Sequence, residues 1–84
     1  MPLSPDERPS FDEVHDWFSD TLTPDALDGY LALLRADPNW LVQIASAPLA
    51  CSLRLYYYPL GEWLTVVLHD EGGQWRPDHV SHEA

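Results

Sequence analysis

The chain has 84 residues, enough for one domain, and its 14 acidic residues against 4 arginines, with no lysine, give a net charge of −10. That charge repels nucleic acid and anionic membranes, so direct binding to either is excluded and a basic protein partner is favoured. The sequence shows no membrane-span or secretory-signal pattern, and its single cysteine, Cys51, suits a reducing compartment. We therefore expect a cytoplasmic protein.

Two helices are predicted in the first half of the chain. Residues 1–9 hold three prolines and are expected to be a flexible lead-in to a domain over residues 10–77. Ser10 and Glu13 form the capping pattern of a helix start, and the apolar residues that follow recur on one side at Phe11, Val14, Phe18 and Leu22. A second helix is expected from Thr23-Pro24, a cap followed by a proline at the first helical position, to Asp37-Pro38.

The second half of the chain predicts strands. Residues 40–46 alternate as a strand, residues 47–52 are expected to be a loop or irregular edge, and residues 53–75 read as two consecutive hairpins. Four-residue turns at 59–62 and 70–73 would pair Tyr58 with Trp63 and Leu68 with Trp75. Pro77 is expected to stop the last strand and to leave residues 78–84 as a flexible tail.

The predicted fold is therefore α+β, with two N-terminal helices packed on one face of a three- to four-stranded antiparallel meander sheet. Strand alternation places a mainly apolar set on the face that meets the helices, namely Leu55, Tyr57, Leu64, Val66, Leu68 and Trp75. The opposite face has nothing in the sequence to cover it.

Two surfaces are candidates for binding a partner. The uncovered sheet face carries residue types enriched at binding hot spots, and this aromatic face is predicted to contact a partner or a second copy through Arg54, Tyr56, Tyr58 and Trp63. The alternative is that the loop around Pro48 covers it. The helices carry an acidic stripe, made of Asp12, Glu13, Asp16, Asp20, Asp25 and Asp28. On one helix its first four charges would lie about 3–4 Å apart, close to the ~3.4 Å spacing of phosphates along a DNA strand. The alternative is a solvated face that serves solubility.

No catalytic motif is present, so the chain is predicted not to be an enzyme. Cys51 is expected to be a small buried apolar residue, because nothing near it in the sequence promises a lowered pKa. His69, His79 and His82 are candidate metal ligands, but their spacing is not diagnostic, and no metal or cofactor is expected.

These features favour a small acidic protein-binding domain. The specific hypothesis is an inhibitor of the antitoxin, immunity or phage anti-defence kind that occupies a basic nucleic-acid-binding surface. One alternative is a homo-oligomeric subunit that uses the aromatic face. A second is a small histidine-based metalloprotein.

Overall fold

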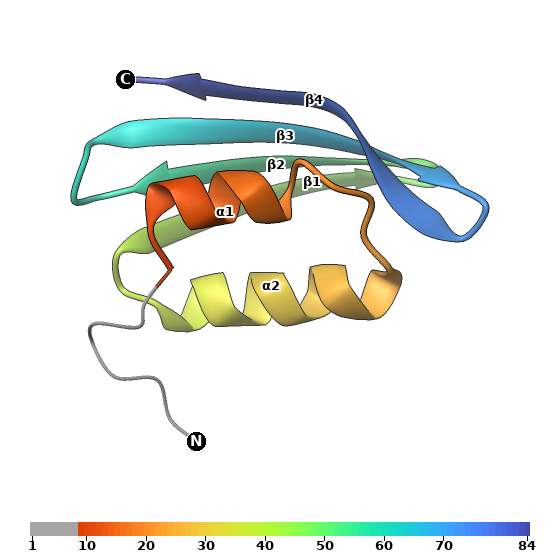
Figure 1. The fold of residues 1–84 in the computed structure, drawn as a ribbon, viewed down its shortest axis with the longest axis horizontal. Coiled ribbons are helices and arrows are strands. Elements are labelled where there is room, and N and C mark those ends of the chain that lie inside the picture. The colour runs from red at the N-terminus through yellow and green to blue at the C-terminus, as the bar shows by residue number, and fades with distance from the viewer. Residues whose placement is uncertain (1–8) are drawn as a thin grey trace.

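The computed structural model describes residues 9–84 of the chain, so the lead-in expected over residues 1–9 lies, apart from Pro9, outside the described residues. Two helices precede four strands (Figure 1). Their bounds are α1 Phe11–Trp17, α2 Pro24–Ala36, β1 Trp40–Ala47, β2 Ala50–Tyr57, β3 Glu62–Glu71 and β4 Gln74–Glu83. The strands form one antiparallel sheet in the order β1-β2-β3-β4, and both helices lie on the same side of it. The predicted α+β meander is confirmed.

Both helices begin as the sequence predicts. The Glu13 N–H donates to the Ser10 hydroxyl at 3.2 Å, and the Ala26 N–H donates to the Thr23 hydroxyl at 3.1 Å. These caps satisfy backbone donors that the first helical turn leaves unpaired.

The first helix is shorter than its sequence pattern suggested, because α1 ends at Trp17. There the Ser19 hydroxyl donates to the His15 carbonyl at 2.7 Å, a side-chain bond that competes with continued helix formation. Asp20 therefore lies in the connection to α2, and the prediction that one helix carries Asp12, Asp16 and Asp20 is wrong.

The two-faced sheet is confirmed, although the predicted register is wrong by two residues. The turn after β2 spans residues 58–61, so Tyr56 pairs with Trp63, and a two-residue glycine turn pairs Asp70 with Trp75. Because side chains alternate with a period of two, a shift of two residues leaves every one of them on its predicted face.

Strand content at both ends of the sheet was underestimated. The loop expected over residues 47–52 is only the Pro48-Leu49 turn, and β2 begins at Ala50. The predicted stop at Pro77 and the tail over residues 78–84 are wrong, because β4 continues to Glu83. The strand continues past Pro77 because β4 is an edge strand, which tolerates the missing N–H of a proline. A β-bulge follows, since Val67 pairs with His79 and Leu68 with Pro77, which leaves Asp78 without a partner on β3.

The core lies between the helices and the inner sheet face. Its fully buried side chains come from both layers, and they are Val14, Phe18, Leu34, Leu53, Leu55, Leu64, Val66 and Leu68. Trp75 packs against this core from β4, and its backbone pairs with Leu22 just before α2. This arrangement leaves the outer face of the sheet, here called the open face, uncovered by helices.

Candidate functional site

The four predicted aromatic-face residues lie together on the open face. The Tyr56 ring lies 4.8 Å from the Trp63 ring and 5.1 Å from the Tyr58 ring, measured between centroids. The Arg54 guanidinium carbon lies 4.3 Å above the Trp63 ring, a cation–π contact that holds both groups in place. We call Arg54, Tyr56, Tyr58 and Trp63 the aromatic cluster.

The cluster is accessible from solvent. Tyr58 is 54% exposed, Arg54 is exposed, and Tyr56 and Trp63 are each half-buried. Their positions follow from local structure, because Arg54, Tyr56 and Trp63 alternate outward on β2 and β3 while Tyr58 opens the turn between those strands. The Tyr58 N–H donates to the Asn39 carbonyl at 2.9 Å, which fixes this turn against the start of β1.

The sheet register adds open-face residues that the sequence analysis missed. Leu41 of β1 pairs with Tyr56, and Glu83 of β4 pairs with Trp63, so an apolar and an acidic side chain flank the cluster. The regular alternation of Trp40 to Ser46 was enough to place Leu41 on one face of its strand, opposite to Trp40 and Val42. Glu83 could not be placed, because its segment was expected to be a tail.

The six acids of the predicted stripe are all exposed on the helical side of the chain. Asp12, Glu13 and Asp16 lie on α1, Asp25 and Asp28 lie on α2, and Asp20 lies between the helices. None of the six forms an ion pair within residues 9–84. They make a dispersed acidic surface rather than a single linear row.

A charged group of side chains surrounds His69 near the β3–β4 turn. Its Nε2 lies 2.9 Å from Glu71 Oε2, and its Nδ1 makes a 2.6 Å charge contact with Asp78 Oδ1. The hydrogen bond with Glu71 raises the pKa of His69. Partial burial of the ring lowers this pKa by a smaller amount, and the charge of Asp78 raises it further. The same bond, helped by Arg76, lowers the pKa of Glu71.

The three histidines weighed as metal ligands do not converge. His69 and His79 lie on the open face, whereas His82 lies on the helical side, where its ring meets Phe11 at 5.2 Å. Within residues 9–84, no group of three or more His, Cys, Asp or Glu side chains is arranged to hold a metal ion. Neither helix in this range has the length and apolar content needed to cross a bilayer.

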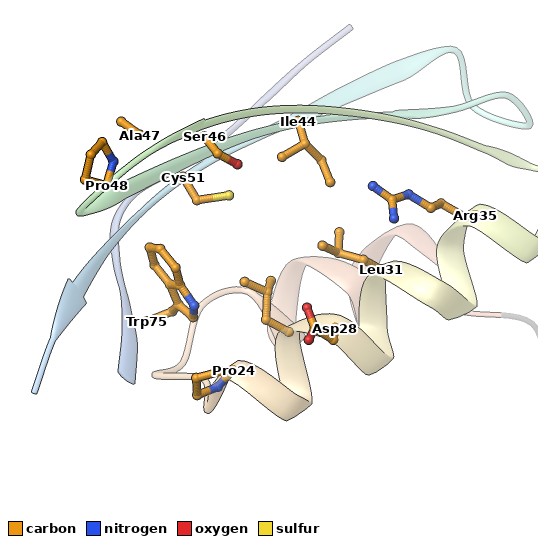
Figure 2. A pocket seen from close by; sticks show the side chains of 11 residues that line it. Pro24, Asp28, Leu31, Arg35, Ile44, Ser46, Ala47, Pro48, Cys51 and Trp75 are labelled. Atoms are coloured by element: carbon orange, nitrogen blue, oxygen red, sulfur yellow. The ribbon is translucent and has the colours of Figure 1, made fainter. Parts of the chain in front are cut away.

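A pocket of about 360 Å³ lies between α2 and the β1–β2 hairpin. Figure 2 shows the Cys51 thiol pointing into it, with Trp75 at one end and Arg35 at the other. Cys51 is buried, as predicted, and burial raises the pKa of its thiol against a smaller lowering by a hydrogen bond with Ser46. A thiol held protonated is a poor nucleophile, and His69 points to the opposite side of the sheet. Cys51 and His69 therefore do not form a nucleophile–base pair in this pocket.

Comparison of the chain with protein-family models, curated proteins and solved structures gave no match. Arguments about function therefore start from the surfaces described above.

Proposed function

We propose that the chain is a non-enzymatic protein-binding domain whose anchor is the aromatic cluster on the open face. The observation that carries the proposal is the contact geometry of Arg54, Tyr56, Tyr58 and Trp63 on the sheet face that lies away from α1 and α2. Tyrosine, tryptophan and arginine supply much of the binding energy at protein interfaces, because they bury large areas and also offer polar atoms. Their mutual contacts hold the rings in place before binding, which lowers the entropic cost of association.

The partner that fits this chain is basic. A net charge of −10 attracts a cationic protein over long range and accelerates its encounter. The six acids of the helical side have no intramolecular cation within residues 9–84 and so contribute fully to this field. At the anchor itself, Glu83 beside Trp63 offers a carboxylate to a partner lysine or arginine, and the exposed Tyr58 ring offers a cation–π contact.

The finer form of this proposal is inhibition. An acidic domain that docks on a nucleic-acid-binding surface would exclude the nucleic acid, as antitoxins, immunity proteins and phage anti-defence proteins do as a functional class. The net charge of −10 supports this form, because it draws the chain towards a basic surface even though the six acids lie on the side opposite the anchor. Competition tests it: the partner should release bound DNA or RNA when this chain is added, and simultaneous binding of both would contradict inhibition.

Variant-controlled capture from extracts of the source cells tests the protein-binding proposal. The immobilised chain should retain a discrete basic protein, and an Arg54→Ala/Tyr58→Ala variant should lose it. The matched control is Arg35→Ala/Leu33→Ala, which removes one exposed arginine and one exposed apolar group from α2, on the helical side of the sheet. Retention of the same protein by both variants would refute the anchor.

The salt dependence of association tests the charge argument separately. The association rate with the captured partner should fall steeply between about 0.05 and 0.5 M salt, because the Debye length shortens over that range. Replacing Asp12, Asp16 and Asp20 with asparagine should lower the rate at low salt. A rate that is independent of salt would remove electrostatic steering from the proposal.

A further inference from the structure

The two edges of the sheet are built differently. An edge strand presents unpaired backbone N–H and C=O groups to which another strand can add, and proteins usually block such edges with charges, prolines or bulges. In the order β1-β2-β3-β4, the edges are β1 and β4. The β4 edge is blocked in all three ways, with Pro77, the extra residue at Asp78, and further charged side chains at Arg76 and Glu83.

The β1 edge has none of these protections. Its eight residues, WLVQIASA, contain no charge and no proline, and they pair with β2 residue by residue without a bulge. Beyond that pairing, β1 makes one backbone hydrogen bond within residues 9–84, from the Trp40 N–H to the Asp37 carbonyl at 3.1 Å. No other backbone group of residues 9–84 pairs with the rest of this outer edge, which therefore offers donors and acceptors to a further strand.

Apolar side chains beside this edge are also incompletely covered. Leu41 on the open face is 38% exposed, and Ile44, which lines the pocket on the helical side, is 36% exposed. A strand added to β1 would cover both, one on each face of the sheet.

The charge distribution indicates which strand fits. All 14 acidic residues lie outside residues 38–61, and that segment, which holds β1 and β2, has Arg54 as its only charged residue. Two copies that each carry −10 repel at most orientations, because carboxylates then oppose carboxylates. Contact through β1 brings the acid-free segments of the two copies together, and beside Ile44 the pocket lining holds one acid, Asp28, together with the cation Arg35.

We propose that a second copy of this chain occupies the β1 edge, with the two β1 strands antiparallel about a twofold axis that is perpendicular to the sheet. The result is one continuous eight-stranded sheet with an isologous interface. All four helices then lie on one side, and both aromatic clusters lie on the other. This dimer is argued from β1 alone and does not rest on the proposed partner.

Sedimentation of the full chain over a range of concentrations tests the proposal. The expected result is a reversible monomer–dimer equilibrium that salt strengthens, because screening reduces the repulsion between copies. Salt should weaken binding to a basic partner, so the two proposals predict opposite responses and can fail independently. A monomer at every concentration and salt level would overturn the dimer.

Variants locate the interface. Ile44→Lys should raise the dimer dissociation constant at least about tenfold. Each copy loses a covered aliphatic contact, and the new lysine lies beside the same lysine of the second copy. Leu60→Lys is the matched control, since it makes the same charge change at an exposed leucine in the β2–β3 turn, and it should dimerise like the natural chain. A dimer that survives Ile44→Lys but dissociates in Arg54→Ala/Tyr58→Ala would place the contact on the open face and overturn the proposal.

Hydrogen exchange gives a readout that needs no variant. Amides of β1 between Val42 and Ser46 should exchange more slowly as the concentration rises through the dimer transition, whereas β4 amides should not change. Concentration-independent exchange along β1 in a sample that dimerises would overturn the edge-to-edge arrangement.

Discussion

Alanine substitutions at Leu55 and Tyr58 should separate folding from binding. Leu55 is fully buried on the inner face of β2, so Leu55→Ala removes a core side chain and should cost about 3 kcal/mol of unfolding free energy. Tyr58 is 54% exposed and makes one aromatic contact, with Tyr56, that is worth about 1 kcal/mol. A chain of this length is stable by about 4–13 kcal/mol, so the first loss is severe and the second is small.

Urea unfolding followed by tryptophan fluorescence, with a thermal scan beside it, measures both effects. Leu55→Ala should lower Tm by about 12–24 °C, and Tyr58→Ala by about 4–8 °C. The Tyr58→Ala variant should nevertheless lose partner binding, which Leu55→Ala retains wherever it is folded. Equal losses of stability would refute the assignment of inner and open faces.

Three further predictions concern pH and backbone conformation. The raised pKa of His69 should be visible by NMR as titration above the ordinary 6.5, and Asp78→Asn should lower it. Protonated His69 should contribute its full stabilisation of the fold below the ordinary histidine pKa, and this stabilisation should be lost as pH rises through the raised pKa of His69. Ionised Glu71 behaves in the opposite way, since its stabilisation should be lost as pH falls through the lowered pKa of Glu71. Gly29→Ala should raise the free energy of unfolding by about 0.5–1 kcal/mol, because a Cβ there meets nothing within 4 Å in a helix, whereas Gly73→Ala at φ +82° should lower it by about 1–2 kcal/mol.

The fold was predictable because its signals are local. The caps at Ser10 and Thr23 and the period-two alternation of residues 53–57 and 63–69 each depend on neighbours in the sequence. The face of the sheet on which each side chain lies was predicted correctly although the strand register was wrong. Moving the turn from 59–62 to 58–61 displaces the pairing by an even number of residues, which leaves the faces unchanged.

The missed features depend on contacts between distant residues. A proline stops an interior strand, and only the edge position of β4 explains why strand pairing continues past Pro77 to Glu83. The early end of α1 is a local exception: the Ser19 hydroxyl donates to the His15 carbonyl, a side-chain bond that helical periodicity does not report. The contrast between the β1 and β4 edges required the strand order.

Photo-crosslinking in source cells tests the central claim that the open face binds another protein. A photoreactive phenylalanine analogue at Tyr58 should form a discrete adduct with a protein of different mass, and the same analogue at Leu33, an exposed apolar residue of α2, should not. An adduct at Leu33 with none at Tyr58 would show that the helical side binds the partner, and no adduct at either position would contradict the protein-binding function.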